Sequence, residues 1–297
     1  MSLKIWIDGQ FQSTEDAKVS VLSHALHYGT GVFEGIRSYP TANGAAVFRL
    51  REHLLRMQRG AEALGMSFAL DACEQAVVET LRVNQQAEAY IRPLAWYADG
   101  GLGLDLGKQT AHLMVATIAW SSHLGGHKVR VTVSPMRRNT ARAMPALKLT
   151  GGYTNATMAK LEAARRGFDE ALFVDDAGQV VECTGENVFL VKDGKVVASE
   201  HPDALGGITR QTAIELTGAE VRPVSLAELK AADEVFLTGT SAEICAVEAI
   251  DDRVYGDNPV TRDLSARYQR IVHGEEPRYR HWLTEYGLDA KAGRVAA

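Results

Sequence analysis

Short strand-like and helical segments alternate irregularly along this chain of 297 residues, and this pattern constrains its fold more than any other feature. The first half predicts strands at 5–7, 47–49, 89–97 and 111–120 and helices at 51–64 and 71–84. The second half predicts strands at 129–133, 170–174, 188–191 and 196–198 and helices at 155–166, 210–217 and 259–272. Because the order lacks the regular βαβ units of a doubly wound sheet, we expect an α+β protein.

The length favours two domains over one. The segment 121–128 contains Gly125-Gly126 and lies between two strand-like runs, so it is the best candidate for a linker. We therefore predict a small N-terminal domain over 1–120 and a larger C-terminal domain over 129–297.

Charge and composition exclude several classes of function. The formal net charge is -5, whereas a nucleic-acid surface requires clustered Lys and Arg, so we expect no nucleic-acid partner. No apolar run has the length of a membrane span, and the N-terminus lacks the pattern of a signal peptide. Three widely spaced cysteines without a CxxC pair are typical of reduced thiols. These features predict a cytoplasmic protein without a membrane anchor.

The sequence matches neither of two nucleotide-binding motifs and offers no complete set of metal ligands. The glycine-rich loop 100–108 has Leu106 where a dinucleotide fingerprint needs its third glycine. It has Leu102 and Gln109 where a P-loop needs glycine and Ser or Thr. His24 and His27 could share a helix face, but no third ligand is near them in the sequence, so we expect no metal site.

Lys148 is the candidate nucleophile. It lies among aliphatic residues just before Gly151-Gly152, and an apolar environment favours the neutral amine that a nucleophilic lysine needs. Taken alone, this segment is more typical of a surface lysine at the end of a strand than of a nucleophile.

Three further segments change that balance. Glu182 lies in an apolar stretch and could pair with a protonated ring nitrogen. Gly207-Ile208-Thr209 precedes a helix, with Thr209 as the expected N-cap, and helix N-termini bind phosphate. Thr240-Ser241 ends a strand and could form a second anion nest. A lysine, a carboxylate and two phosphate cradles are the parts that a pyridoxal phosphate site requires.

The chain strongly resembles the branched-chain amino-acid aminotransferases of fold type IV. Seven ordered blocks carry the resemblance, within a stretch that runs from Trp6 to Trp282. The blocks are 23–38, 48–54, 90–94, 148–153, 182–189, 207–210 and 232–245. The resemblance implies a small N-terminal α/β sandwich, a larger C-terminal pseudo-barrel, pyridoxal 5'-phosphate as cofactor and a homodimer or higher homo-oligomer. It also implies amino transfer between Leu, Ile or Val and 2-oxoglutarate, which yields L-glutamate.

The resemblance assigns cofactor roles residue by residue. Lys148 would carry the cofactor as a Schiff base and move the proton between Cα and C4′. Glu182 would keep the pyridine nitrogen protonated, and Tyr153 would donate to the phenolate oxygen. The residues that would hold the phosphate are Arg51, Gly207, Ile208, Thr209 and Thr240.

It assigns substrate roles in the same way. Tyr90, Arg92 and the amides near Ser241 would surround the substrate carboxylate, and Arg37 would support the pocket electrostatically. The residues that would line a mostly apolar pocket are Tyr28, Phe33, Gly35, Leu104, Trp120 and His123.

This sequence departs from its relatives at a few positions. His123 stands where many relatives have tyrosine, and Gly152 where they have asparagine. Gly206 replaces a proline, and Cys183 and Thr184 replace smaller residues. None of these changes removes a catalytic group, but His123 bears on the range of substrates.

Other activities share this fold and stay open at this point. They are a D-amino-acid aminotransferase, an aminodeoxychorismate lyase and an (R)-selective amine transaminase. A catalytically silent protein that binds pyridoxal phosphate is the alternative outside the enzymes. The sequence does not rank Leu, Ile and Val as substrates.

Overall fold

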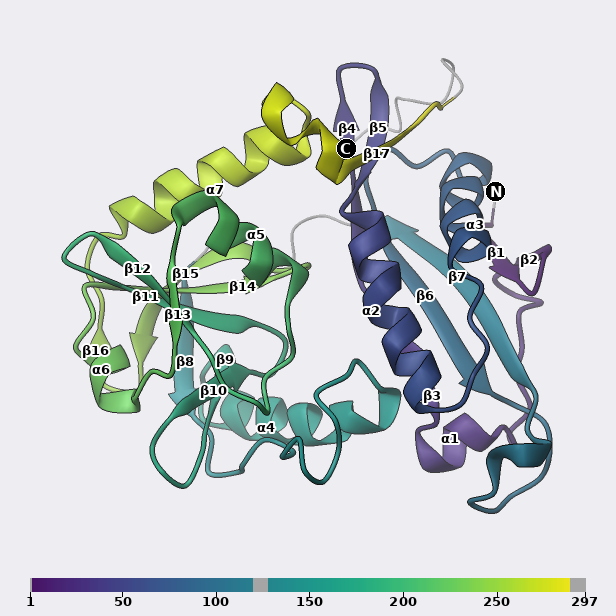
Figure 1. The fold of residues 1–297 in the computed structure, drawn as a ribbon, viewed down its shortest axis with the longest axis horizontal. Helices are drawn as coiled ribbons and strands as arrows, with labels where there is room; N and C mark the ends of the chain where they lie inside the picture. Colours follow the sequence, from purple (N-terminus) through teal and green to yellow (C-terminus); the bar gives the residue numbers. More distant parts are fainter. Residues whose placement is uncertain (1, 120–127, 289–297) are drawn as a thin grey trace. The chain divides into compact units, whose positions relative to one another are not determined.

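The computed structural model describes residues 2–119 and 128–288, and their helices and strands mix as an α+β fold (Figure 1). Contacts divide the chain into two compact units. The first consists of 1–120, 147–151 and 270–297, and the second of 121–146 and 152–269. This grouping differs from the predicted domains because Leu147–Gly151 and the C-terminal segment join the first unit. The predicted linker lies almost entirely outside the described residues, so the domain boundaries stay a prediction.

The first unit is built on an antiparallel sheet. Its elements are β1 (Lys4–Ile7), β2 (Gln10–Ser13), α1 (His24–Tyr28), β3 (Gly31–Phe33), β4 (Ile36–Thr41), β5 (Gly44–Phe48), α2 (Leu50–Ala63), α3 (Leu70–Val83), β6 (Ala89–Tyr97), η1 (Leu106–Lys108), β7 (Ala111–Ala119), η3 (Pro277–Trp282) and β17 (Leu283–Tyr286). The described strands follow the order β17-β5-β4-β6-β7-β1-β2, and β3 pairs with β6. Helices α2 and α3 contact each other and pack on this sheet (Figure 1).

Helix α2 shows why this unit folds as it does. Its buried residues recur with helical spacing, at Leu50, His53, Leu54, Met57 and Ala61, so one face of the helix packs on the sheet. The helix ends where Gly65 takes a positive φ of 71°, as its glycine predicts. The predicted helix at 51–64 is therefore confirmed to within one residue at each end.

The second unit contains a mixed sheet that curls into a half-barrel. Its elements are β8 (Val129–Val133), η2 (Thr150–Gly152), α4 (Tyr153–Arg165), β9 (Glu170–Val174), β10 (Val180–Cys183), β11 (Asn187–Lys192), β12 (Lys195–Ser199), α5 (Ile208–Thr217), β13 (Glu220–Arg222), α6 (Leu226–Lys230), β14 (Glu234–Gly239), β15 (Glu243–Ile250), β16 (Arg253–Val254) and α7 (Pro259–Val272). The described strands follow the order β10-β9-β8-β15-β14-β11-β12-β13, and β16 pairs with β15. Helix η2 begins in the first unit, and α7 ends in it.

Local chemistry sets the β11–β12 hairpin. Asp193 and Gly194 both have positive φ, 51° and 72°, as a two-residue turn with inverted dihedrals requires. The predicted turn is confirmed. The main hydrophobic core of this unit consists largely of aliphatic side chains from β8, β11, β14 and β15.

Candidate functional site

Lys148 is anchored to β3 in the first unit. The Phe33 amide donates to the Lys148 carbonyl oxygen at 3.2 Å, and Leu149 forms an antiparallel bridge with Val32. The Thr150 hydroxyl donates to the carbonyl oxygen of Gly29 at 2.6 Å. The Lys148 side chain is partly buried, and its Nζ lies 4.9 Å from the centroid of the Phe33 ring. This lysine is therefore fixed by its backbone and lies beside an aromatic wall.

A buried ionic cluster lies near Lys148 in the same unit. Glu34 is fully buried and accepts hydrogen bonds from His53 Nδ1 at 2.8 Å and from Arg56 Nε and Nη2 at 2.7 and 2.8 Å. Burial alone would raise the pKa of Glu34, but Arg56 and His53 outweigh it and hold this pKa well below its usual range. Glu34 is therefore a permanent carboxylate at neutral pH.

The pKa of His53 depends on its burial and on the same neighbouring charges. Burial lowers its pKa most, and the charges of Arg56 and Lys148 lower it further, against the raising effect of Glu34. A neutral His53 can still donate from Nδ1 to Glu34. The influence of Lys148 on His53 shows that this lysine lies within electrostatic reach of the cluster.

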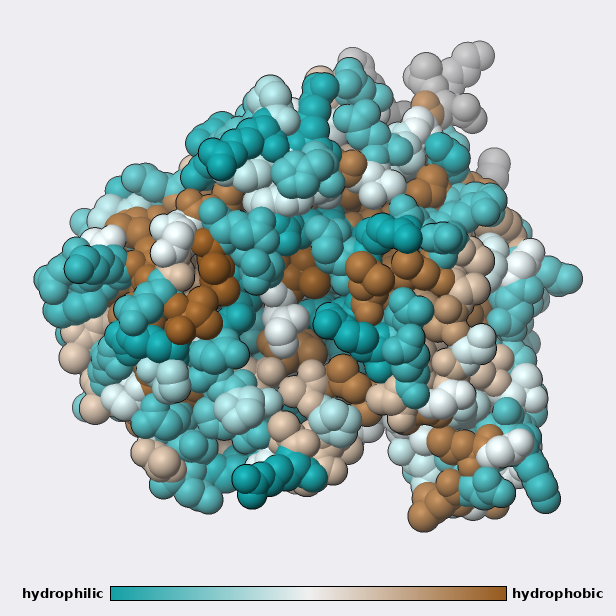
Figure 2. Space-filling model, viewed as in Figure 1, coloured by the Kyte–Doolittle hydropathy of each residue, from teal (hydrophilic) through white to brown (hydrophobic). Residues whose placement is uncertain are grey.

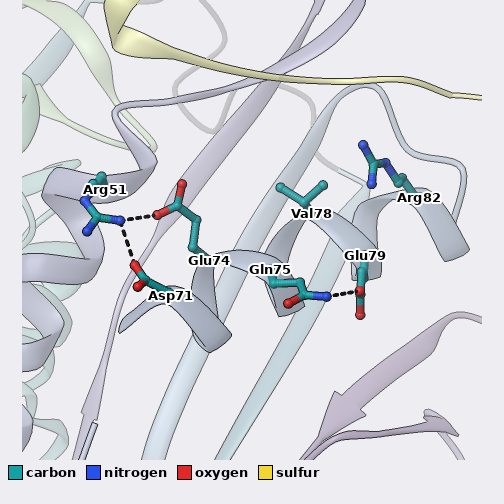
Figure 3. A pocket seen from close by; sticks show the side chains of 7 residues that line it. All are labelled: Arg51, Asp71, Glu74, Gln75, Val78, Glu79 and Arg82. Carbon is teal, nitrogen blue, oxygen red and sulfur yellow. Dashed lines mark hydrogen bonds and ion pairs between the residues drawn. The ribbon is translucent and has the colours of Figure 1, made fainter. Parts of the chain in front are cut away.

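Arg51 has a different position from the one its expected role needs. Figure 3 shows its guanidinium turned to α3, where Nη1 donates to Asp71 and Glu74, both at 2.9 Å. Its side chain is 54% exposed. A helix turns by about 100° per residue, so Arg51 and His53 lie on nearly opposite faces of α2, whereas Arg56 shares the face of His53. The structure thus does not support Arg51 as a phosphate ligand, and Arg56 is the buried arginine of this helix.

Four residues expected at the substrate come together in the first unit. The Arg92 guanidinium lies over the Phe33 ring, 4.6 Å from its centroid, and its Nη2 donates to the Tyr90 hydroxyl at 2.9 Å. A Cβ at Gly35 would lie 2.1 Å from that hydroxyl, so only glycine leaves room for Tyr90. Residues 90 and 92 share one face of β6, as the strand period of two requires.

Arg37 is buried beside this group. It lies opposite Tyr90 in the β4–β6 register, donates to Glu88 at 2.9 Å and lies over the Tyr39 ring at 4.7 Å. Tyr28 and Leu104 are exposed in this unit. Their place in a pocket stays a prediction.

Trp120 and His123 fall outside the described residues. Their expected roles in substrate selection stay predictions from the sequence.

In the second unit, Glu182 lies on β10 and is held by two donors. Arg138 Nε donates to its Oε1 at 2.7 Å, and the Leu205 amide donates to its Oε2 at 2.9 Å. Both side chains of the ion pair are largely buried, at 13% and 6% exposed. The carboxylate is therefore fixed in orientation and balanced in charge.

Tyr153 begins α4, next to the group that holds Glu182. Arg138 Nη1 donates to Asn155 Oδ1 at 3.3 Å, and Asn139 Nδ2 donates to the Gly152 carbonyl oxygen at 3.3 Å. Segment 137–139 thus connects the first turn of this helix to the Glu182 carboxylate.

The N-terminus of α5 lies close in sequence to the loop that bonds Glu182. Gly207 is the N-cap, and Thr209 is buried in the first turn, so the expectation that Thr209 caps the helix is wrong. First-turn amides have no partner within a helix, so those of Ile208 and Thr209 can bind an anion. A Cβ at Gly207 would lie 2.1 Å from Asn187 Oδ1, so a larger residue at this cap would displace the Asn187 side chain.

Thr240 and Ser241 form the turn between β14 and β15 and are partly buried. Thr238, just before them, pairs with Asn187 of β11. Asn187 Nδ2 in turn donates to the Leu205 carbonyl oxygen at 2.8 Å. The end of β14, the loop before α5 and Glu182 are therefore neighbours within this unit.

These groups fit a phosphorylated pyridine cofactor by their chemistry. The second unit offers a buried carboxylate, a helix N-terminus and the Thr240–Ser241 turn, and the buried Thr238 hydroxyl has no hydrogen-bond partner. The first unit offers a lysine and a buried arginine, Lys148 and Arg56.

Sequence reasoning missed four residues, Glu34, His53, Arg56 and Arg138. The first two lie within the recognised blocks, and Arg56 lies just past the end of one. Their polar character inside apolar patterns was the available signal. Arg138 is one of an adjacent arginine pair and carries no such signal.

Among the described residues, no cluster of His, Cys, Asp and Glu has the geometry of a metal site. None of the helices described is long and apolar enough to cross a membrane.

Comparison with known proteins agrees with this geometry. The family described as Amino-transferase class IV matches residues 31–250. A branched-chain-amino-acid aminotransferase of Pseudomonas aeruginosa is 36% identical over 94% of this chain and 96% of its own length. A putative one of Methanocaldococcus jannaschii is 41% identical, over 91% and 96%.

Solved structures show the same fold. The branched-chain aminotransferase of Thermoproteus uzoniensis, solved with norvaline, has a TM-score of 0.92 and 40% identity, and covers 96% of this chain and 99% of that chain. One from T.th., complexed with N-(5'-phosphopyridoxyl)-L-glutamate, has a TM-score of 0.92 and 43% identity, over 95% and 98%.

Proposed function

Because the chain belongs to the class IV aminotransferases, we propose that it transfers amino groups between branched-chain L-amino acids and 2-oxoglutarate with pyridoxal 5'-phosphate. The observation that carries the proposal is Lys148 fixed beside Phe33, in a chain whose second unit holds a charge-balanced Glu182. The names and bound compounds of similar proteins support the cofactor and the substrate class.

The residues act as follows when the cofactor is bound. Pyridoxal phosphate supplies the electron sink that stabilises negative charge at the substrate Cα. Lys148 would hold the cofactor at its aldehyde carbon and, as a free amine, would move a proton to and from the substrate Cα. Glu182 would keep the ring nitrogen protonated, because Arg138 and the Leu205 amide hold it as an oriented carboxylate. Tyr153 would donate to the phenolate oxygen.

Phosphate contacts come from the amides of Ile208 and Thr209, with Gly207 as the N-cap, and from Thr240. We assign the phosphate arginine to Arg56 in place of Arg51. A buried guanidinium keeps more of its electrostatic strength than an exposed one.

Substrate contacts come from the group on β3, β4 and β6. Tyr90 and Arg92 receive the carboxylate, together with the turn at Ser241. The Phe33 ring and the small Gly35 accept an aliphatic side chain. A carboxylate receptor of this kind favours an amino acid over a simple amine.

The decisive test of the activity is a panel of amino donors. L-leucine, L-isoleucine and L-valine should convert 2-oxoglutarate to glutamate, and D-amino acids and (R)-amines should be at least tenfold poorer donors, about 1.4 kcal/mol in selectivity. Preference for a D-amino acid or an amine without a carboxylate would overturn the substrate assignment. Borohydride reduction and peptide mapping should label Lys148. A label on Lys160 would refute its role.

The two arginines can be compared directly. Arg56→Lys should weaken pyridoxal phosphate binding by roughly tenfold, because a lysine cannot reproduce the bidentate fork. Arg51→Gln should leave the affinity within twofold. Titration of the apoenzyme, followed by cofactor absorbance, measures both. The reverse order would return the role to Arg51.

We also propose a cytoplasmic homo-oligomer. Its cysteines, Cys73, Cys183 and Cys245, are buried thiols, as a reducing compartment allows. A groove of about 430 Å³ beside α1 has apolar walls that include Val19, Leu26 and others. Figure 2 shows hydrophobic side chains on the surface around α1 and the loop before η1. Leu26→Asp should shift the mass measured by light scattering to that of a monomer if a second copy covers this groove.

A further inference from the structure

The turn 184–186 links three groups to which the proposed function gives a role. It follows Glu182 at the end of β10 and precedes Asn187 at the start of β11. It also contacts the end of β14, since a Cβ at Gly239 would lie 3.2 Å from Glu186 Cγ. Thr240 follows Gly239 directly. Any shift of this turn would therefore reach Glu182, Thr240 and, through Asn187, the loop before α5.

The turn is fastened to a buried carboxylate outside the proposed site. Glu170, at the start of β9, is 5% exposed. Its Oε1 accepts from the Thr184 hydroxyl at 2.6 Å and the Thr184 amide at 3.2 Å. Its Oε2 accepts from Lys160 Nζ of α4 at 2.5 Å.

A second carboxyl group lies within electrostatic reach of the first. Glu186 Oε2 accepts from the Gly185 amide at 3.2 Å, and burial and the negative charge of Glu170 both raise the pKa of Glu186. Lys160 Nζ pairs with Glu170, so Glu186 is the carboxyl group of the two that more readily holds a proton.

We infer that Thr184, which fastens the turn to Glu170, and Glu186, which lies against Gly239, are positioning residues that hold Glu182 and the Gly239–Thr240 corner in place for pyridoxal phosphate. The inference rests on the proposed function, since it concerns the same cofactor. Neither residue needs to touch the cofactor. Their effect passes through the backbone that connects them to Glu182.

The electrostatics of the turn agree with this arrangement. Burial raises the pKa of Glu186 most, the charge of Glu170 raises it further, and Lys160 opposes both, with a result of about 8. Two thiols also face these carboxylates, Cys183 on β10 and Cys245 on β15, and burial raises the pKa of each. Glu182 lies next to Cys183 and acts on it. Above about pH 8, one lysine would face two carboxylates, and the turn should loosen.

Cofactor affinity of the apoenzyme tests the hydroxyl bond. Thr184→Val keeps the shape but removes one partly buried hydrogen bond, so we expect about fivefold weaker binding of pyridoxal phosphate. Thr184→Ser should restore most of it. Thr217→Val is the matched control, since its hydroxyl only bonds Ala213 of its own helix. If Thr184→Val lowers the urea midpoint of the apoenzyme but leaves the affinity unchanged, the residue is structural and the inference is wrong.

The proton on Glu186 provides a second, independent readout. Glu186→Gln stays uncharged at every pH, so its affinity for the cofactor should match wild type near pH 7. Between about pH 7 and pH 9.5, wild type should lose at least fivefold more affinity than this variant. Glu248→Gln, at an exposed position of β15, should follow wild type. Identical profiles for wild type and Glu186→Gln would overturn the inference, whereas a wild type that binds no pyridoxal phosphate would overturn the proposed function instead.

Discussion

Replacing Glu34 by Gln tests how strongly the buried ionic cluster supports the first unit. The change keeps the volume of the side chain but removes its charge and replaces one acceptor oxygen with a donor. Arg56, whose side chain is 6% exposed, would then lack its counter-charge. Breaking a buried pair in this way costs about 3–5 kcal/mol, because the remaining charge is desolvated without compensation.

Urea unfolding at pH 7 measures this cost directly. For a chain of this length, each kcal/mol corresponds to roughly 2–4 °C in Tm. Glu74→Gln is the matched control. Glu74 also pairs with an arginine, Arg51 at 2.9 Å, but that arginine side chain is 54% exposed. An exposed partner contributes little, so the control should cost about 1 kcal/mol or less.

The difference between wild type and Glu34→Gln should depend on pH with a definite sign. The pKa of Glu34 is lowered by folding, so its contribution is fully present above the unfolded pKa, about 4.3, and is lost as the pH falls below it. The stability difference should therefore be constant from pH 7 to about 5 and shrink in more acidic solution. A difference of less than about 1 kcal/mol at pH 7, or one that grows in acid, would refute this reasoning.

Three further changes probe the two units separately. Glu182→Gln should still bind pyridoxal phosphate but lose roughly 100-fold in kcat, measured with L-leucine, and near-normal turnover would move the electrostatic role to another residue. Gly60→Ala should lower the free energy of unfolding in urea by about 1–3 kcal/mol, because its Cβ would lie 2.5 Å from Val32 Cγ2. This loss should outweigh the gain of about 1 kcal/mol in helix propensity. A more stable variant would show that β3 can move to make room. Gly207→Ala should weaken cofactor binding by about tenfold, because its Cβ would displace Asn187, and unchanged affinity would argue against a phosphate at this helix.

Features set by neighbouring residues were predictable from the sequence. The Asp193-Gly194 turn needs two residues that tolerate positive φ, and both are present at that point of the chain. The strand at 170–174 and the two α2 and α3 helices follow from hydrophobic spacing and end where the pattern ends. In each case the information lies within a few residues.

Features set by distant partners were not predictable in this way. Lys148 joins the first unit because Leu149 bridges Val32, more than a hundred positions earlier. Helix α2 packs on β3, and a Cβ at Gly60 would contact both Val32 and Leu149. Arg56 lies one turn before Gly60 on that face, whereas Arg51 lies on the opposite face. The sequence places both arginines on one helix, but only the tertiary structure shows which of them is buried.

The segment Phe33-Glu34-Gly35 shows how one short stretch serves both faces of its strand. Strands β3 and β4 both pair with β6 in an antiparallel ladder. This ladder is interrupted at Glu34 and Gly35, which lie between the paired residues of β3 and those of β4. At this point the Glu34 amide donates to the Pro93 carbonyl oxygen at 3.0 Å, and Pro93 has no amide to donate in return.

Successive side chains of this segment point to opposite faces of the strand and have different partners there. Glu34 turns its carboxylate to His53 and Arg56 of α2, while Phe33 remains under the Arg92 guanidinium on the other face. Gly35 leaves the space that the Tyr90 hydroxyl fills. Because side chains alternate with a period of two, a register slip of one residue would turn Phe33 toward the helix and bring Glu34 to the substrate face. The pairs of β3 and of β4 with β6 share one register, so the antiparallel ladder on either side of the interruption holds the alternation on which both the ionic cluster and the carboxylate receptor depend.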